Sequence, residues 1–398
     1  MIAKKVQAIL EEGRGISQMF GDAAQMIAEL GAENVYNFSI GNPSVEPPEA
    51  VKEAIIEELN TQKPMTLHSY TGGLGYADVR KAIADNENKH FGTNFGANNV
   101  VMTVGAAGGL SVIFQVLLNP GDQVITFAPY FSEYKCYAMH MDAELVLSGT
   151  DEEFQPKLDE LESKINEKTR IILINSPNNP TGAVYPEETL RKISDLAVKK
   201  GEEYGAPIYI VSDEPYRYVA YDGVEVPYLP NCCKNAIVGN SFSKSLSLPG
   251  ERLGFLVIPS DIDGYAEIYD ACNTINRTMG FVNAPSLIQK AVAKCLDAEV
   301  DVEGYKKCRD LLWQGLVDIG YECFKPQGAF YLFMKCPAPV EDDWKFYEMA
   351  KKYQLVLGPG SGFGGPGYVR ISYCVDYHMI EKALPKFKEL WDEVQSLK

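Results

Sequence analysis

Short apolar runs rich in β-branched residues recur along the middle of the chain, between about residues 100 and 260. Most of them are continuous rather than alternating, which is typical of strands buried on both faces, and helical patterns such as Leu190 to Lys199 separate several of them. We therefore expect an α/β fold with a three-layer domain, in which helices cover a mostly parallel, seven-stranded sheet. The predicted strands lie in VVMTVG, DQVITFAP, AELVLSG, RIILINSP, IYIVSDEP, NAIVGNSFS and RLGFLVIP.

Both ends of the chain differ from this middle region. The pattern predicts two short helices near the N-terminus, and amphipathic helices again from about Ser286 onward. We expect residues 49–285 to form a large domain, and residues 1–48 and 286–398 to pack together as a smaller α+β domain. The other elements predicted for the chain ends are strands in VYNFSIG, GAFYLFMK and YVRISYC, helices through LIQKAVAKCLDAEV and YKKCRDLLWQGLVDIG, and a closing helix from Met379.

Composition narrows the class of protein. The chain has 398 residues, of which 46% are hydrophobic and 23% charged, so it fits a soluble globular enzyme with two domains. No apolar stretch is long enough to span a bilayer, and the N-terminal residues lack the pattern of a signal peptide. The net charge of −17 disfavours nucleic acid and anionic membranes as partners. We therefore expect a cytoplasmic enzyme with small-molecule substrates.

The cysteines and histidines show no spacing typical of metal or catalytic sites. The nine cysteines are scattered without CxxC spacing, and adjacent cysteines such as Cys232 and Cys233 rarely form a disulfide, so a reducing compartment is indicated. The four histidines show neither HxxxH spacing nor any other pairing. We therefore expect no zinc or other metal site and no serine triad.

The segment that carries the most chemistry is SFSKSLSLPGERLG, residues 241–254. Lys244 follows an apolar strand, and burial lowers the pKa of a lysine, so that more of it is a nucleophilic amine. Such lysines form Schiff bases with carbonyl compounds. The hydroxyls of Ser241 and Ser243 and the guanidinium of Arg252 are groups that bind phosphate. A carbonyl and a phosphate together suggest pyridoxal 5′-phosphate as the cofactor.

A glycine-rich turn, Gly105-Ala-Ala-Gly-Gly, leads from the first predicted strand of the sheet into a helix. Free backbone N–H groups at the start of a helix bind anions, although glycine also occurs in turns that bind nothing. A second glycine cluster, residues 358–367, contains GxGxxG but leads into a strand, so we reject a dinucleotide site there. We expect a flexible loop near the active site instead.

Two charged residues interrupt apolar strand patterns. Asp213 ends IYIVSDEP, where a carboxylate needs donors or a cation, such as the protonated ring nitrogen of pyridoxal phosphate, unless it caps a helix. Arg370 lies within YVRISYC, where its planar guanidinium suits a carboxylate of either an amino-acid substrate or an acidic side chain of the protein. Tyr216 and Asn179 follow neighbouring strands and could donate hydrogen bonds to the phenolic oxygen of the cofactor ring.

In this order the motifs resemble those of fold-type I pyridoxal-phosphate enzymes, in the class I/II aminotransferase family, over nearly the full chain. The resemblance implies an aspartate-aminotransferase-like fold. It also implies an enzyme that moves an amino group between an L-amino acid and a 2-oxo acid through a Schiff base on Lys244. The matching stretches are SIGNP at 39–43, SYTGGLGYADVRKAIA at 69–84, TVGAAGGL at 103–110, PYFSEY at 129–134, SPNNPTG at 176–182, SDEPY at 212–216, SFSKSLSLPGERLG at 241–254 and YVRISYC at 368–374.

The resemblance also implies roles for individual residues. Lys244 would bind the cofactor and move the proton at the substrate α-carbon, and Asp213 would pair with the ring nitrogen. Arg370, with Asn179 and the backbone of Gly41, would bind the substrate carboxylate. Tyr70 would reach the phosphate from the partner subunit, so a homodimer is expected. The remaining implied contacts are Gly105, Ala106, Ala107, Ser241, Ser243 and Arg252 at the phosphate, Phe131 stacked on the ring, and Asn179 with Tyr216 at the phenolic oxygen.

One departure from the family bears on specificity. Some aspartate-specific relatives carry a lysine after the glycine of the phosphate loop, where this chain has Ala107, and no second arginine is evident for a side-chain carboxylate. Four aromatic residues near the expected pocket would suit an apolar or aromatic amino acid, although core packing explains most of them equally well. They are Tyr134, Phe330, Tyr331 and Phe363.

Three other functions share part of this pattern. A carbon–sulfur β-lyase, decarboxylase or racemase shares the fold and most of these residues, because such enzymes differ in which bond to Cα breaks. An acyl enzyme with Ser241-Phe-Ser-Lys244 as its SxxK would lack the companion SDN and KTG motifs. A regulator would need a basic DNA-binding module ahead of this body, for which the N-terminus leaves no room. The amino donor, the acceptor and the pathway do not follow from the sequence.

Overall fold

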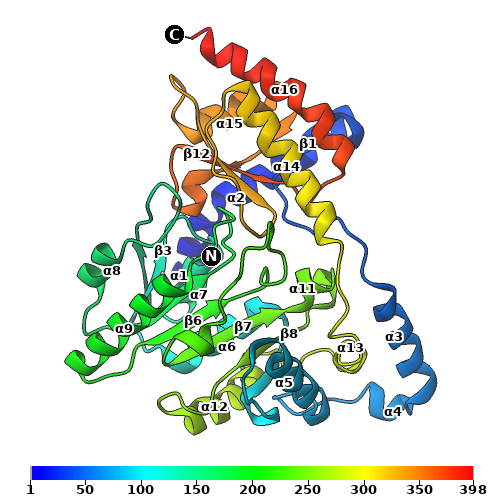
Figure 1. Cartoon of the computed structure of the whole chain (residues 1–398), viewed down its shortest axis with the longest axis vertical. Coiled ribbons are helices and arrows are strands. Elements are labelled where there is room, and N and C mark those ends of the chain that lie inside the picture. The colour runs from blue at the N-terminus through cyan, green and yellow to red at the C-terminus, as the bar shows by residue number, and fades with distance from the viewer. Residues whose placement is uncertain (1, 398) are drawn as a thin grey trace.

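The structure, a computed structural model, describes residues 2–397. Its central sheet consists of β2 (Val100–Thr103), β3 (Gln123–Phe127), β4 (Glu144–Ser148), β5 (Thr169–Asn175), β6 (Tyr209–Asp213), β7 (Ala236–Ser241) and β8 (Gly254–Val257). These are the seven strands predicted from the apolar runs, in the spatial order β2-β8-β7-β6-β5-β3-β4 (Figure 1). The predicted α/β class with a seven-stranded sheet is confirmed.

The sheet is mostly parallel, as predicted. Strand β8 runs antiparallel to its neighbours β2 and β7, while the remaining pairs are parallel. Neighbouring residues of a strand face opposite layers, so that Ile210 and Val211 of β6 belong to different cores and both positions must be apolar. Six strands end at the same edge of the sheet, which is where α/β proteins bind ligands.

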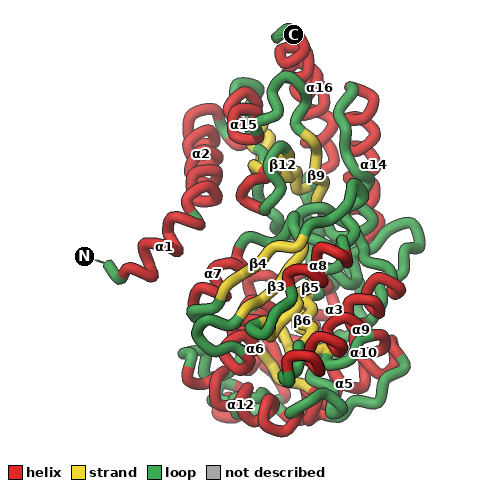
Figure 2. Tube along the Cα trace, turned by 90° about the vertical axis from the view of Figure 1, so that its left-hand side faces the viewer, coloured by secondary structure: helices red, strands yellow, loops and turns green. Residues whose placement is uncertain are grey.

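Helices cover both faces of the sheet and complete the three layers (Figures 1 and 2). One face is covered by α6 (Gly105–Leu117), α7 (Glu133–His140) and α12 (Tyr265–Thr278). The other face is covered by α3 (Glu49–Thr61), α5 (Ala77–Phe91), α8 (Leu158–Lys164), α9 (Glu187–Tyr204), α10 (Leu229–Cys232) and α13 (Ser286–Val292). None of the helices within residues 2–397 combines the length and apolarity needed to cross a membrane.

The two chain ends share a second hydrophobic core. Its strands are β1 (Tyr36–Asn37), β9 (Tyr331–Lys335), β10 (Leu355–Val356), β11 (Gly358–Pro359) and β12 (Tyr368–Ser372), and its helices are α2 (Arg14–Leu30), α14 (Val302–Ile319), α15 (Asp343–Lys351) and α16 (Tyr377–Gln395). The predicted strand pair is confirmed, because β12 pairs antiparallel with β9. The closing helix α16 begins two residues before the predicted Met379, because the Asp376 carboxylate caps it by accepting hydrogen bonds from backbone N–H groups.

Helix α1 (Lys4–Glu12) lies outside this second core. Figure 2 shows it projecting beside the large sheet domain, next to α7. Two ion pairs join it to the region of α7, one between Lys5 and Asp142 and one between Glu12 and Lys135. The N-terminal segment therefore contacts both parts of the molecule: α1 contacts the region of α7 beside the large sheet, and α2 packs in the second core.

The segment after Ser286 differs from its prediction. The helix predicted through LIQKAVAKCLDAEV ends at Val292, and α13 packs against α3 in the core of the large domain. Lys294 strengthens that contact through ion pairs with Glu57 and Glu58 of α3. In our domain proposal the boundary therefore moves from residue 285 to about residue 300, where the chain crosses to α14.

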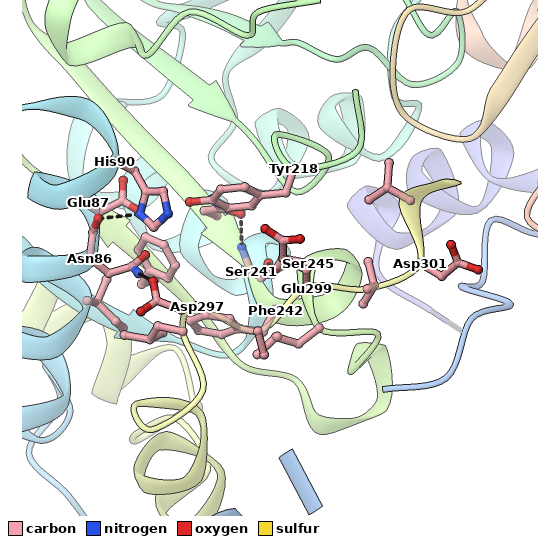
Figure 3. Close-up of a pocket in the computed structure, with 18 of the residues that line it drawn as sticks. Asn86, Glu87, His90, Tyr218, Ser241, Phe242, Ser245, Asp297, Glu299 and Asp301 are labelled. Atoms are coloured by element: carbon pink, nitrogen blue, oxygen red, sulfur yellow. Dashed lines mark hydrogen bonds between the residues drawn. The ribbon is translucent and has the colours of Figure 1, made fainter. Parts of the chain in front are cut away.

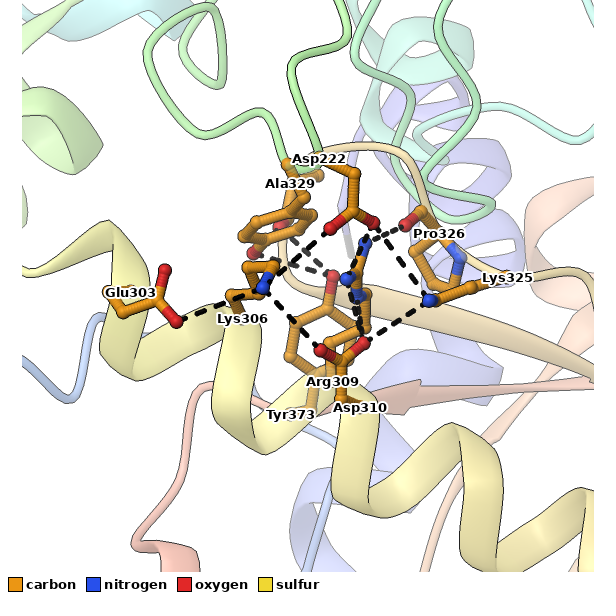
Figure 4. A network of polar contacts seen from close by, with 10 residues as sticks. Asp222, Glu303, Lys306, Arg309, Asp310, Lys325, Pro326, Ala329 and Tyr373 are labelled. Carbon is orange, nitrogen blue, oxygen red and sulfur yellow. Dashed lines mark hydrogen bonds and ion pairs between the residues drawn. The ribbon is translucent and has the colours of Figure 1, made fainter.

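A polar network joins α14, which belongs to the core formed by the chain ends, to the loop that follows β6 (Figure 4). Arg309 of α14 is 1% exposed, and its Nη2 lies 2.8 Å from the carboxylate of Asp222 and 2.7 Å from that of Asp310. Its Nη1 donates to the Pro326 carbonyl at 2.9 Å, and the guanidinium lies 4.6 Å from the centre of the Tyr221 ring. The loop after β6 is thereby fixed against the small domain.

We expect Arg309→Ala to lower the free energy of unfolding by about 2–3 kcal/mol, because it removes the buried member of this network. Urea unfolding monitored by circular dichroism measures the change. Lys306 belongs to the same network but is 31% exposed, so the control Lys306→Ala should cost less than about 1 kcal/mol. Equal losses in the two variants would show that the buried guanidinium has no special role.

Candidate functional site

A cavity of about 310 Å³ lies at the carboxyl edge of the sheet, where it faces the core formed by the two chain ends. Twelve of the fourteen predicted site residues line it, and they come from seven separate stretches of chain. The twelve are Gly41, Ala106, Ala107, Phe131, Asn179, Asp213, Tyr216, Ser241, Ser243, Lys244, Arg252 and Arg370.

Lys244 lies in the single turn α11 (Phe242–Ser245), directly after β7. Its Nζ donates a hydrogen bond to the Gly41 carbonyl at 2.9 Å and lies 5.1 Å from the centre of the Phe330 ring. The pKa of Lys244 is lowered to about 8, mainly by burial; Cys374 opposes this shift, and the positive charges of Arg252 and Arg370 add to it. About a tenth of this amine is therefore uncharged and nucleophilic at pH 7, far more than for a lysine with an ordinary pKa.

Asp213 is buried at the end of β6 without a counter-charge. One carboxylate oxygen accepts a hydrogen bond from the Tyr134 hydroxyl at 2.6 Å, and the other, Oδ1, is buried with no partner in residues 2–397. Burial raises the pKa of Asp213 to about 7, the Tyr134 hydrogen bond lowers it, and the charge of Glu214 raises it. The carboxylate caps no helix, so capping does not explain why Asp213 ends this strand. Its free oxygen is suited to a cationic N–H donor.

The start of α6 and the residues around Lys244 form a cradle for an anion. Gly105 has φ +70°, and a Cβ there would lie 2.5 Å from Nη2 of Arg252, so only glycine allows this close approach. The first N–H groups of the helix, including those of Ala106 and Ala107, lack acceptors within the helix. No hydrogen bond in the described chain uses the hydroxyl of Ser241, although it borders the cavity. Free N–H groups, a free hydroxyl and a guanidinium together suit a phosphate.

Arg370 of β12 is a second buried charge without a counter-charge. Its guanidinium donates to the Asn179 side-chain oxygen at 3.1 Å and to the Ser39 carbonyl at 2.7 Å, whereas its Nε is buried with no partner among the described residues. It lies between the rings of Tyr331 and Phe363, 4.7 and 4.4 Å from their centres. Burial lowers its pKa. The structure contains no ion pair of Arg370 within residues 2–397, which leaves a carboxylate ligand as the better explanation.

The glycine cluster at residues 358–367 lies near the cavity, as predicted, because its Phe363 stacks on Arg370. It does not form an open loop: β11 and a short 3-10 turn occupy its first half, and Gly360 and Phe363 are buried. A Cβ at Gly360 would collide with the backbone of Gly365 and Tyr368. The glycines therefore allow tight packing behind Arg370 rather than flexibility.

Three residues that support the site were missed as functional positions. Tyr134 was noted as an aromatic residue near the pocket but not as the hydrogen-bond donor to Asp213. Asn175 ends β5, where its side chain donates to the Asp213 carbonyl at 2.8 Å and accepts from the Asn179 N–H at 2.7 Å. Its position directly after a buried strand was a usable signal. Phe20 of α2 lines the cavity, and nothing in the amphipathic pattern of that helix distinguishes it.

The structure does not bring Tyr70 to the cavity. Its side chain is 86% exposed, and it borders a separate surface hollow together with Phe281 and Val282. Gly105 also does not line the cavity, although it touches Arg252 from behind. Within one chain, the predicted phosphate contact of Tyr70 is therefore not formed.

A larger cavity of about 450 Å³ lies behind α11 and shares Ser241 with the first (Figure 3). It is bordered by α5 and by residues 296–303, and carries carboxylates such as Glu87 and Asp301. None of its lining residues within the described chain is a lysine or an arginine. It therefore lacks the groups that bind phosphate and carboxylate, and the smaller cavity is the candidate active site despite its size.

Comparisons with known proteins agree with this geometry. The model of the family described as "Aminotransferase class I and II" matches residues 33–387. The aromatic-amino-acid aminotransferase 2 of Thermococcus litoralis is 33% identical, over 91% of this chain and 93% of that one. The aspartate aminotransferase of Pyrococcus horikoshii is also 33% identical, over 98% and 96%. A solved amino transferase from Eubacterium rectale has 45% identity and a TM-score of 0.94, with 99% of each chain covered.

The buried Asp213 predicts an unusual pH dependence of stability in the ligand-free protein. Between its ordinary pKa near 4 and its folded pKa of about 7, the folded protein keeps a proton that the unfolded chain has released, so stability falls as pH rises. Asp213→Asn removes this effect. As the pH rises from 4.5 to 7.5, we expect the free energy of unfolding of the variant to increase relative to that of the wild type by up to roughly 3 kcal/mol. Urea unfolding measures this change. The stability of the exposed control Asp159→Asn should depend on pH as that of the wild type does. If the stability of Asp213→Asn also varied with pH in parallel with the wild type, the raised pKa would not belong to Asp213.

Proposed function

Because the chain belongs to the class I and II aminotransferases, and is an enzyme that transfers amino groups, we propose that it does so with pyridoxal 5′-phosphate held at Lys244. One observation carries the proposal. A buried lysine with a pKa of about 8 lies in one cavity with an unpaired carboxylate, Asp213, and an unpaired guanidinium, Arg370. Each of these groups lacks the partner that the cofactor or an amino-acid substrate would supply.

The residues around the cavity fit this cofactor. The free Oδ1 of Asp213 is suited to the protonated ring nitrogen, and the anion cradle at the start of α6 is suited to the phosphate. When bound, pyridoxal phosphate supplies an aldehyde that reacts with amines and a protonated ring that takes up electrons from the substrate α-carbon. In our proposal the phosphate ligands are the N–H groups of Ala106 and Ala107, the turn at Gly105, and the side chains of Ser241, Ser243 and Arg252. Phe131 packs on the ring, and Asn179 and Tyr216 donate to its phenolic oxygen.

The protein groups then have separate tasks. Lys244 Nζ supplies an amine that is partly uncharged, and it removes and returns the proton at the substrate α-carbon. Asp213 keeps the ring nitrogen protonated, and Tyr134 holds the Asp213 carboxylate in place. Tyr216 is positioned by a 2.9 Å contact between its hydroxyl and that of Tyr331. A Cβ at Gly41 would collide with the Tyr331 hydroxyl, so this packing requires the glycine.

We propose that Arg370 binds the α-carboxylate of the substrate, together with Asn179 and the backbone of Gly41. The cationic side chains that line the cavity in the described chain are Lys244, Arg252 and Arg370, and each has a task in this scheme. No lining cation remains for a second carboxylate. Because Phe20 and Ile40 also line the cavity, we propose an amino acid with an apolar or aromatic side chain as the preferred donor, and a 2-oxo acid as the acceptor.

We further propose a homodimer in which Tyr70 reaches the phosphate of the partner's site. Its 86% exposed ring, next to Phe281 and Val282 on the surface, supports a contact outside its own chain. A cytoplasmic location fits the nine cysteines, all of which are free in the structure. In the domain division proposed above, Arg370 belongs to the small domain and Lys244 to the large one, and both line the same cavity.

A panel of amino acids tests function and specificity together. The holoenzyme is mixed with one amino acid at a time, without an acceptor, and the visible spectrum of the cofactor is followed. We expect an apolar or aromatic amino acid to convert the cofactor to its amine form, with kcat/KM about 100-fold above that for aspartate, since a buried unpaired carboxylate costs several kcal/mol. A preference for aspartate would refute the substrate proposal. Pyruvate release from a cysteine conjugate, with the original spectrum restored, would instead identify a carbon–sulfur β-lyase.

Mixed dimers test the role of Tyr70. Subunits carrying Lys244→Ala are inactive in our scheme, and Tyr70→Phe should weaken cofactor binding about 10-fold or more, through loss of one hydrogen bond to a charged phosphate. A dimer with one subunit of each kind contains one site with both native residues. At limiting cofactor, we therefore expect the mixed dimers to regain activity that neither parent shows. If Tyr70 acts within its own chain, the mixture gains nothing.

A further inference from the structure

Cys232 and Cys233 place two thiols side by side in the wall of a surface groove, at the end of the sheet away from the active site. Their sulfurs are 3.8 Å apart, at the junction where α10 ends and the chain enters β7. The catalytic residues Asp213 and Ser241 lie at the other ends of β6 and β7. The pair is therefore separated from the cavity by the length of the sheet.

The two thiols border a surface groove of about 960 Å³. Cys232 is 8% exposed and Cys233 is half-buried, so reagents reach the pair from one side. The other polar contacts of these sulfurs are weak: Cys233 Sγ lies 3.4 Å from the Leu190 carbonyl, and Cys232 Sγ lies 3.6 Å from that of Tyr228. A hydrogen bond from Cys233 lowers the pKa of the Cys232 thiol, which makes it the first to become a thiolate.

A direct disulfide between the two is disfavoured by geometry. Adjacent Cα atoms are about 3.8 Å apart, which is shorter than the usual separation of roughly 4.4–6.8 Å across a disulfide. An atom inserted between the sulfurs removes this conflict. One central atom with bonds to sulfur of about 2.3 Å holds two sulfurs about 3.3 Å apart at an angle of roughly 90° and about 3.8 Å apart at the tetrahedral angle. The separation of 3.8 Å in this structure lies at the upper end of that range, so a pyramidal centre such as arsenic(III) is bound after the sulfurs approach by a few tenths of an ångström.

We propose that Cys232 and Cys233 form a paired-thiol site that binds one soft, thiophilic ion, such as arsenic(III), through both sulfurs. Thiolates select soft ions. With phenylarsine oxide, two arsenic–sulfur bonds form, the arsenic–oxygen bond breaks, and the oxygen leaves as water with the two thiol protons, without any change of oxidation state. No set of three or more metal-ligating side chains exists in the part of the chain that the structure describes, so an ion bound by two sulfurs is the form that fits.

Intact mass measurement after treatment of the holoenzyme with phenylarsine oxide tests the site. We expect one adduct per chain. The dithiol 2,3-dimercaptopropanol should remove it, whereas 2-mercaptoethanol at the same concentration of thiol groups should not. Cys232→Ser and Cys233→Ser should each weaken binding roughly 100-fold or more, because each loses the advantage of intramolecular second attachment. The control Cys136→Ser, another half-buried cysteine, should bind as the wild type does.

Circular dichroism and thermal melting establish that each serine variant is folded, and the corresponding alanine variants replace any that is not. An adduct that survives in both single variants would overturn the proposal, and so would removal by the monothiol alone or the absence of any adduct. Because the readout is mass rather than turnover, the result is independent of whether the proposed cofactor and substrates are correct.

Discussion

The burial of charged groups without opposite charges is the constraint on which this structure depends. Lys244, Asp213 and Arg370 all line one cavity, and none of them forms an ion pair within residues 2–397. Removing such groups from water costs several kcal/mol each unless other interactions compensate. Here compensation is partial: a carbonyl accepts from Lys244, a tyrosine donates to Asp213, and an amide oxygen and a carbonyl accept from Arg370. What remains unsatisfied matches the charges of a phosphorylated pyridine aldehyde and of an amino acid.

The fold brings these groups together from distant parts of the sequence. Parallel strands β6 and β7 place Asp213 and Lys244 at one edge of the large sheet, while β12 of the small domain carries Arg370 to the same cavity. The network around Arg309 and the packing of Phe330 beneath Lys244 join the two domains close to the site. The distance between the substrate carboxylate site and the reactive amine is therefore set by how the two domains pack, as well as by the local sequence around each residue.

The sequence predicts the buried strands and the polar residues at their ends. It does not predict contacts between residues that are distant along the chain. Short apolar runs predicted all seven strands; six of them are buried on both faces, which allows no polar alternation, while the edge strand β4 is only partly buried. Charged or amide residues at or just after the ends of such runs made Asp213, Asn179 and Lys244 candidates, and the structure brings all three to one cavity. The hydrogen bond from Tyr134 to Asp213 joins residues 79 positions apart and leaves no local signal. Similarly, α13 has an amphipathic pattern that fits either domain, and only its packing against α3 assigns it to the large one. A contact between subunits, as proposed for Tyr70, can be read neither from the sequence pattern nor from the structure of one chain.

Attachment of the cofactor to Lys244 is the central claim, and chemical trapping tests it directly. The holoenzyme is reduced with borohydride, which fixes a cofactor joined to a lysine amine, then digested, and the labelled peptides are identified by mass spectrometry. The account predicts one labelled peptide, carrying the pyridoxyl group on Lys244. A label on a different lysine, or no label on protein that retains activity, would contradict it.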